Sequence, residues 1–372
     1  MASIQKRDNG RWRARYRDSA GREHARHFGR KVDAQPWLDK VTAAVVTDTY
    51  VDPRAGGITF GAFFAEWAAR QVWTEGSRLS AQQAASSVTF ARVPMRDLRP
   101  SHLQGWVKAM SLPAPSRRQG LAPSTVRTRF NWVHIALRGA VADRVIPTDP
   151  SAGLRLPRVR KQAAAMTIPT PAEVGRATAA AAGHFQAFVE VCAFAGLRLG
   201  EAAGLQVADV DFLRRTVTVA RQVQGQTNST LTVVAPKYGS ERVIPVSDEL
   251  LLSLGRHLER FGAWGADRWV FGDGVHLFQR NSAGNQWRNA RAAADLPEPL
   301  TLHDLRHFYA SGLISTGCDV VTVQRALGHS SPSITLNVYA HLWPKAEDRT
   351  RAASAELWRE VHADHLRTEE AQ

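Results

Sequence analysis

Hydrophobic and polar positions alternate with a period of two near the start of the chain. In an extended segment over residues 11–17, with the sequence RWRARYR, apolar side chains occupy one face and basic side chains the other. The basic face comprises Arg11, Arg13, Arg15 and Arg17. A turn at residues 18–21 leads to a second extended segment ending at Phe28, and Asp33 is the expected N-cap of the helix that follows. The pattern predicts a small sheet backed by one helix.

From Thr59 onward the apolar residues recur at helical spacing. The first stripe consists of Phe60, Phe63, Phe64 and Trp67. Further helices are expected over residues 101–110 and 124–141, the second with Ser124 as its N-cap. Its apolar face comprises Val126, Phe130, Val133 and Leu137. Arg127 and Arg129 lie off that face, where they either contact a partner or form an ordinary solvated surface.

A second strong helix start, near the middle of the chain, opens the last and largest expected domain. Thr170 and Glu173 have the spacing of a capping box, with Pro171 at the first helical position. Strands are expected over residues 216–221, 231–234 and 242–246, and a final helix over 351–366.

These elements predict an α+β multidomain fold. It comprises a small N-terminal three-stranded sheet plus helix, an all-α domain, and a mostly α domain with a small antiparallel sheet. At 372 residues the chain is long enough for two to three domains. The expected boundaries are 1–55, 58–157, 165–350 and a C-terminal helix and tail over 351–372, with linkers at 53–57 and 155–161.

Positive charge narrows the class of partner. The formal net charge is +14 with a pI near 10.6, and residues 1–31 hold 10 Lys or Arg against 3 acidic residues. Such a surplus favours a polyanion, and nucleic acid is preferred over a membrane because the longest apolar runs, such as 189–197, are too short to span one. Neither a secretion signal nor a C-x-x-C pattern is present. Cys192 and Cys318 are expected to be reduced, which favours a cytoplasmic protein.

Three segments of the second half carry the candidate chemistry: 195–205 (AGLRLGEAAGL), 302–307 (LHDLRH) and 327–339 (LGHSSPSITLNVY). Phosphoryl transfer needs positive charge at the non-bridging oxygens, a nucleophile in line and an acid for the leaving oxygen. Arginine suits the first task because its planar fork meets two phosphate oxygens at once. The candidate residues are Arg198, Lys237, His303, Arg306, His329 and Tyr339.

This set resembles the tyrosine recombinase (phage integrase) family, specifically in the catalytic segments and more weakly towards the N-terminus. The resemblance implies that Arg198 binds the scissile phosphate with support from Glu201, and that His303 and Arg306 contact the same phosphate and help the nucleophile. It also implies that His329 donates a hydrogen bond to a phosphate oxygen. Lys237, expected in a hairpin between strands, is the implied general acid. Tyr339 is the implied nucleophile, with its phenolate stabilised by the surrounding cations.

The resemblance also implies an activity and partners. The expected protein is a site-specific DNA recombinase that acts through a 3′-phosphotyrosine, without metal, ATP or other cofactor. It would integrate or excise a phage or mobile element, as a homotetramer on double-stranded attachment sites and associated with the nucleoid. A directionality factor and a host DNA-bending protein are candidate accessory partners. The domain at 1–55 would bind distal arm sites, and the helical, SAM-like domain at 58–157 would clamp the core site.

Four alternatives stay open on the sequence. A type IB topoisomerase uses a similar residue set, although the basic N-terminal segment argues against it. A metallohydrolase would exploit the i, i+4 spacing of His303 and His307, although an arginine between them would repel a dication. A DNA-binding protein that has lost recombination is a third. Each residue also has a structural alternative, such as an ion pair between Arg198 and Glu201.

Overall fold

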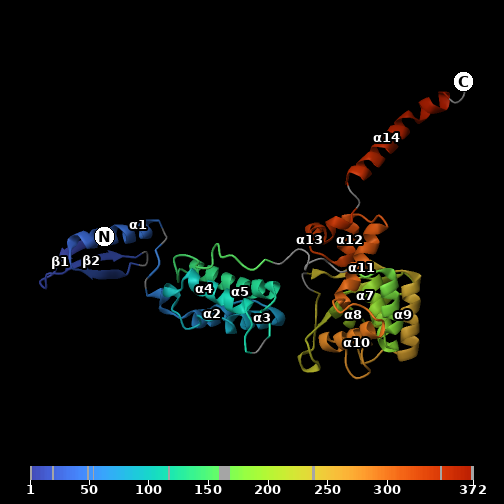
Figure 1. The fold of residues 1–372 in the computed structure, drawn as a ribbon, viewed down its shortest axis with the longest axis horizontal. Helices are drawn as coiled ribbons and strands as arrows, with labels where there is room; N and C mark the ends of the chain where they lie inside the picture. Colours follow the sequence, from blue (N-terminus) through green and yellow to red (C-terminus); the bar gives the residue numbers. More distant parts are fainter. Residues whose placement is uncertain are drawn as a thin grey trace. The chain divides into compact units, whose positions relative to one another are not determined.

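The computed structural model describes residues 2–18, 21–47, 50–52, 54–115, 118–158, 168–236, 239–343 and 346–369, without the side chains of 346–349, 352 and 363–369. Short Cα distances divide the chain into two compact units, residues 1–164 and 165–372 (Figure 1). The finer division into domains stays a prediction. None of the described helices is both long and apolar enough to cross a membrane.

The first unit begins with the predicted antiparallel sheet. Its order is β1-β2-β3, and a helix packs on one face: β1 (Ser3–Lys6), β2 (Trp12–Arg17), β3 (Glu23–Phe28) and α1 (Lys31–Val46). Ala14 and Tyr16 are buried against this helix, so the two-residue alternation was interpreted correctly. The predicted cap was wrong, because the N-cap is Arg30 and Asp33 lies in the first turn, where its carboxylate pairs with the Arg30 guanidinium.

After the sheet and its helix, the described residues of this unit form four more helices around one apolar cluster. They are α2 (Phe60–Ala69), α3 (Glu75–Ser86), α4 (Pro100–Ser111) and α5 (Pro123–Ala142), with short 3₁₀ turns at Ala55–Gly57 and Met95–Asp97. The predicted apolar faces of α2 and α5 are buried in this cluster. The cap prediction for α5 was wrong: the helix begins at Pro123 after Ala122, which puts Ser124 in the first turn. Helix α3 was not predicted, because its sequence is mostly polar and small.

The second unit surrounds its core with helices and small sheets. Its helices are α6 (Pro171–Ala180), α7 (Gly183–Phe194), α8 (Leu199–Ala203), α9 (Asp248–Phe261), α10 (Arg280–Ala293), α11 (Leu302–Ser315), α12 (Val320–Leu327), α13 (Pro332–Tyr339) and α14 (Ala346–Glu369), with 3₁₀ turns at Val207–Asp209, Asn228–Thr230 and Ala340–Leu342. Thr170 caps α6 through the predicted capping box. The apolar helix α7 packs against α9 and α11 (Figure 1), and its buried face forms much of the core.

The strands of this unit form two antiparallel sheets. One has the order β4-β5-β8 and the other pairs β6 with β7: β4 (Val210–Asp211), β5 (Thr216–Val219), β6 (Gln222–Gln224), β7 (Thr232–Val234) and β8 (Arg242–Pro245). The three predicted strands are present with shorter bounds. β7 and β8 belong to different sheets, so these two strands do not pair as the two arms of the expected hairpin. Lys237, expected in that hairpin, lies outside the described residues.

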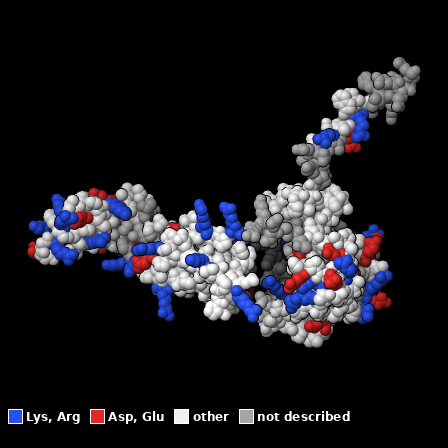
Figure 2. Space-filling model, in the orientation of Figure 1, with Lys and Arg blue, Asp and Glu red and all other residues white. Residues whose placement is uncertain are grey.

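Basic side chains mark the surface of the first unit. Figure 2 shows lysines and arginines over the sheet and the helical bundle, with fewer acidic side chains among them. Arg11, Arg17 and Arg127 are exposed, and Arg129 is half-buried. Arg13 and Arg15 both pair with Glu23 of the neighbouring strand, at 3.2 Å and 3.9 Å. The arginines of residues 11–17 therefore differ in their pairing, since Arg13 and Arg15 share a carboxylate on the neighbouring strand.

Helix α5 offers a test of this packing. Leu137 is fully buried, whereas Ile135 on the same helix is 48% exposed. We expect Leu137→Ala to lower the free energy of unfolding by about 2–5 kcal/mol, because it leaves a cavity among rigid neighbours. Ile135→Ala, the matched control, should change it by about 0.5 kcal/mol or less. Urea unfolding followed by tryptophan fluorescence measures both. Equal decreases would show that α5 does not present the face described.

Candidate active site

Five of the six predicted catalytic residues line one cleft of about 500 Å³ in the second unit. Its walls are formed by Arg198, His303, Arg306, His307, Gly328, His329, Ser330, Ile334, Val338 and Tyr339. The sixth residue, Lys237, lies outside the described residues. The cleft therefore brings together side chains that are up to 141 positions apart in the chain, from Arg198 to Tyr339.

Each side of the cleft is positioned by a different local structure. Helix α11 supplies His303, Arg306 and His307 within little more than one turn. Arg198 is the N-cap residue of α8, and Tyr339 is the last residue of α13. Burial of Leu302 and Leu305 in the core fixes the orientation of α11 and turns the polar residues towards the cleft.

A glycine permits the close approach of α11 to the chain before Arg198. Gly196 adopts φ +63°, and a Cβ added there would lie 2.4 Å from Cδ1 of Tyr309. Its carbonyl oxygen accepts a 2.6 Å hydrogen bond from Nη1 of Arg306. The glycine thus serves both backbone conformation and packing.

The carboxylate of Glu201 joins two arginines beneath the cleft. Arg198 donates to Oε1 at 2.6 Å, and Arg242 donates to Oε2 at 2.9 Å and to Oε1 at 3.2 Å. Burial alone would raise the pKa of Glu201, but hydrogen bonds from Arg242 and the charges of both arginines lower this pKa to about 2. Glu201 is therefore ionised at neutral pH and binds one edge of the half-buried Arg198 guanidinium. The ion pair between Arg198 and Glu201, considered above as a structural alternative, is thus the same contact by which Glu201 would support Arg198.

Arg306 is buried, and among the described residues no carboxylate forms an ion pair with it. The residue is 2% exposed, and its guanidinium donates to the backbone carbonyls of Gly196 and Leu327. Burial, followed by the charge of Arg198, lowers the pKa of Arg306 to about 9, which leaves the side chain charged at neutral pH. A buried cation that is met only by carbonyl dipoles is costly, and an anion in the cleft would compensate it.

The cationic charge around the cleft exceeds the anionic charge. Among the described residues, Arg198, Arg242 and Arg306 lie around one buried carboxylate, that of Glu201. The fold maintains this surplus of positive charge, because Arg242 and Arg306 are almost completely buried and cannot turn towards water. A monoanion with several acceptor oxygens, such as a phosphodiester, matches this surplus in charge and in hydrogen-bonding capacity.

His329 is held in a defined orientation after α12. Its Nδ1 lies 2.9 Å from the hydroxyl of Thr335, a fully buried residue of α13. Burial and then the charge of Arg306 lower the pKa of His329 to about 4, so the ring is neutral at pH 7. With Nδ1 bonded to the hydroxyl, Nε2 is the nitrogen that remains for a ligand.

Tyr339 forms part of the wall and is only 1% exposed. Its hydroxyl lies 2.7 Å from Nδ1 of His307. The cations were expected to favour the phenolate, and Arg306 and Arg198 do act in that direction. Burial outweighs them and raises the pKa of Tyr339 to about 12. At neutral pH the nucleophile candidate is therefore a protonated phenol, although the two arginines lower the cost of its phenolate in the expected direction.

Three contributors were missed at the sequence level. Arg242 entered the sequence analysis only as the first residue of an expected strand, Thr335 was not considered, and His307 was treated only as part of a zinc-like spacing. Arg242 could have been suspected because a buried Glu201 needs cationic partners. The contact of His307 with Tyr339 spans 32 positions and has no local signal.

The metal alternative gains no support from the geometry. No group of three or more His, Cys, Asp or Glu side chains suited to a metal ion occurs within the described part of the chain. His303 and His307 do stack edge to face, with ring centroids 4.8 Å apart. However, Nδ1 of His307 is occupied by the Tyr339 hydroxyl.

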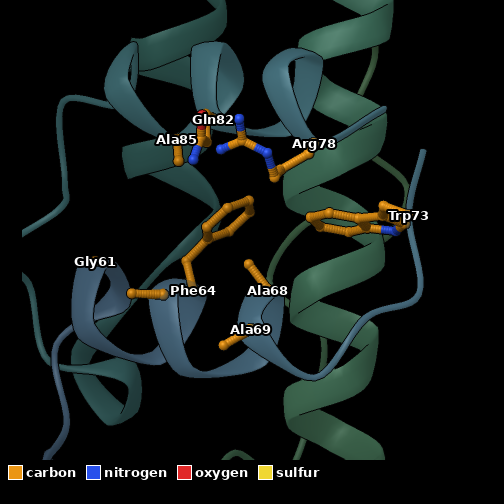
Figure 3. A pocket seen from close by; sticks show the side chains of 9 residues that line it. Gly61, Phe64, Ala68, Ala69, Trp73, Arg78, Gln82 and Ala85 are labelled. Atoms are coloured by element: carbon orange, nitrogen blue, oxygen red, sulfur yellow. The ribbon is translucent and has the colours of Figure 1, made fainter. Parts of the chain in front are cut away.

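A second hollow, of about 400 Å³, lies in the helical bundle of the first unit (Figure 3). Phe64 and Trp73 supply its largest apolar surfaces, and Arg78 and Gln82 its polar ones. The guanidinium of Arg78 is paired with Glu75, at 2.7 Å from Nε to Oε2. Hence this hollow lacks the surplus charge and the nucleophile that distinguish the cleft around Tyr339.

Two family models match this chain. The model of the Phage integrase family matches residues 170–345, which include the whole cleft. The model of the phage integrase N-terminal domain matches residues 2–47, the sheet and helix of the first unit. Together the two models match well over half of the 372 residues.

Relatives extend over nearly the full chain. The phiRv2 prophage integrase of Mycobacterium tuberculosis is 26% identical over 367 residues, which cover 94% of this chain and 93% of the relative. The ICEBs1 integrase of Bacillus subtilis is 30% identical over 175 residues, 44% of this chain and 46% of that protein.

Solved structures share the fold. The Tn1549 transposon integrase in complex with a circular intermediate DNA has a TM-score of 0.68 at 20% identity, covering 80% of this chain and 99% of that one. The lambda integrase tetramer bound to a Holliday junction has a TM-score of 0.56 at 16% identity, covering 89% and 96%. With both family models matched and a relative aligned along nearly its whole length, the chain belongs to the phage integrase family.

Proposed function

We propose that this chain is an integrase-type site-specific DNA recombinase that cuts and rejoins strands through a 3′-phosphotyrosine at Tyr339. One observation carries the proposal: the Tyr339 hydroxyl lies in the wall of a cleft whose buried cations lack a matching number of anions. A phosphodiester would supply the missing anion and place phosphorus beside the phenol.

Charge stabilisation falls to the arginines and His329. Arg198 and Arg306 bind the non-bridging oxygens, because both guanidiniums line the cleft. Glu201 supports Arg198, and Nε2 of His329 donates to a further oxygen. Charge that develops on phosphorus is thus met by groups whose positions are already fixed, so that little reorganisation is needed in the transition state.

Bond energy explains how the reaction proceeds without ATP. Attack by Oη of Tyr339 exchanges one phosphodiester for another and releases a 5′ hydroxyl, and the reverse step restores DNA. Lys237 is the proposed acid that protonates the leaving 5′ oxygen. No metal is required in this scheme, since the guanidiniums supply the positive charge that a divalent ion would otherwise provide.

Double-stranded attachment sites are the proposed substrate, and a homotetramer on DNA the proposed assembly. Support for the assembly comes from the fold likeness to lambda integrase, which has been solved as a tetramer on a Holliday junction. Arg11, Arg13, Arg15 and Arg17 are proposed to bind the arm sites. Arg127 and Arg129 of α5 are proposed to bind the core site. A directionality factor and a DNA-bending protein remain proposed accessory partners.

A type IB topoisomerase is the second candidate, since its chemistry would use the same cleft. The match of residues 2–47 to the phage integrase N-terminal domain favours the integrase. The two differ in outcome: a topoisomerase relaxes any supercoiled plasmid, whereas an integrase needs a pair of attachment sites.

Tyr339→Phe removes only the nucleophilic oxygen. We expect this variant to bind attachment-site DNA with unchanged affinity and to form no covalent protein–DNA adduct, because the ring still fills its buried position. Denaturing gel electrophoresis after incubation with a nicked suicide substrate measures the adduct. Tyr309→Phe is the matched control and should form the adduct normally. An adduct that persists in the Tyr339 variant would show that another residue attacks.

Lys237→Ala tests the general acid. We expect it to slow cleavage of ordinary DNA by about 10²–10⁴-fold, and to leave unchanged the cleavage of a substrate with sulfur at the 5′ bridging position, because thiolate leaves without protonation. Single-turnover rates on the two substrates measure the difference. Equal slowing on both would refute the assignment of Lys237.

The basic face of residues 11–17 predicts a change in salt dependence. Replacing Arg11, Arg13, Arg15 and Arg17 together by Gln should weaken binding to arm-site DNA and reduce the slope of log K against log salt by about 0.9 for each phosphate that is no longer neutralised. The matched control replaces the same four by Lys, which keeps the charge and should keep most of the slope. Titrations by fluorescence anisotropy at several salt concentrations measure both. An unchanged slope in the Gln variant would exclude this face as the DNA-binding surface.

A further inference from the structure

The hydroxyl of Tyr339 contacts a histidine other than the one expected. Nδ1 of His307 lies 2.7 Å from Oη, within the range at which a proton can pass between two groups. His303, for which the resemblance implies help to the nucleophile, packs edge to face against the ring of His307, with centroids 4.8 Å apart. His307 therefore stands between His303 and the phenol.

Charged and titratable groups surround this pair on several elements. On α11 itself these are His303, Asp304 and Arg306, and from other elements Arg198 and His329 approach the phenol. Burial, followed by the influence of His303, lowers the pKa of His307 to about 4. A neutral imidazole keeps one nitrogen as an acceptor, and a phenol has one proton to donate.

We propose that His307 is a catalytic residue that accepts the proton of Tyr339 during attack on DNA and returns it on rejoining. The inference rests on the proposed function and adds the proton acceptor on the nucleophile side. In cleavage, the Oη–H bond breaks as the Oη–P bond forms, and the proton moves to Nδ1 of His307. The P–O5′ bond breaks, and the 5′ oxygen leaves with a proton from Lys237. Rejoining reverses each transfer.

Substrate charge would switch this base on. Burial, with the influence of His303 and Arg306, lowers the pKa of His307 and makes it a weak base, and burial raises the pKa of Tyr339 and keeps it protonated. A phosphodiester adds one negative charge to the same cleft, which stabilises a protonated imidazole. The base therefore strengthens when DNA is bound, and the phenol is unreactive in its absence.

The test isolates the nucleophile side of the reaction. It uses the full chain and a suicide duplex with sulfur at the 5′ bridging position, which removes the need for Lys237, and it records single-turnover cleavage between pH 5.5 and 9 as a chosen range. His307→Asn is the decisive variant, because its amide oxygen can accept the hydrogen bond from Oη but cannot take a proton. His307→Ala removes both capacities.

We expect both variants to cleave about 10²–10⁴-fold more slowly, with rates that rise in proportion to hydroxide, whereas the unaltered chain reaches a plateau. DNA binding and the melting temperature should be preserved in His307→Asn. If the alanine variant loses its fold, the asparagine variant carries the test alone.

Three outcomes would overturn the inference. One is a rate and pH profile in His307→Asn equal to those of the unaltered chain, since His307 would then only position Tyr339. Another is retention of the plateau in both variants. The third is a plateau that disappears in His303→Asn but not in His307→Asn, which would assign the base to His303. Tyr339→Phe run in parallel separates the two levels, because an adduct in that variant contradicts the proposed function itself.

Discussion

The buried carboxylate of Glu201 is the interaction on which the rest of the site depends. Glu201 forms ion pairs with Arg198, at the start of α8, and with Arg242 of β8, and so connects these two elements. Arg242 extends the connection to α12 by donating to the carbonyl of Ala326 at 2.8 Å. Loss of one partner from such a buried group is strongly destabilising, by about 3–5 kcal/mol, because an uncompensated charge remains. The positions of the cleft walls are therefore coupled to one carboxylate.

To bind a phosphate, the cleft must keep positive charge that its own carboxylates do not neutralise. If each arginine had its own carboxylate, the cleft would be neutral and would gain little from a phosphate. Arg306 instead donates to two backbone carbonyls, which satisfy one donor on each terminal nitrogen without neutralising the charge. The cost of an underpaired cation is carried by the apolar core that fixes α7 and α11. Stability of the core thus allows a site that is poised for an anion.

Local sequence predicted the elements and most of the site, and failed where distant residues decide. The alternation over residues 11–17 and the capping box at Thr170 depend on neighbours in sequence, and both were confirmed. Asp33 was misassigned because aspartate is favoured both at the N-cap and in the first turn of a helix. In the structure Asp33 lies in the first turn, where it pairs with Arg30. Arg242 pairs with Glu201 from 41 positions away, a distance over which periodicity carries no information. Motif resemblance located the cleft residues, but it does not distinguish which histidine of the LHDLRH segment meets the phenol.

Burial of Tyr339 constrains how its proton leaves. A free phenolate would need the cations of the cleft, yet those same cations are neutralised in part when a phosphodiester binds. DNA therefore weakens the electrostatic support for prior ionisation of the phenol while it strengthens His307 as a base. Transfer of the proton during attack avoids a free phenolate beside a protonated imidazole. In a cleft of low dielectric, a path that conserves charge is favoured over one that first separates it. The same burial that makes the phenol inert without DNA thus selects a concerted transfer once DNA is present.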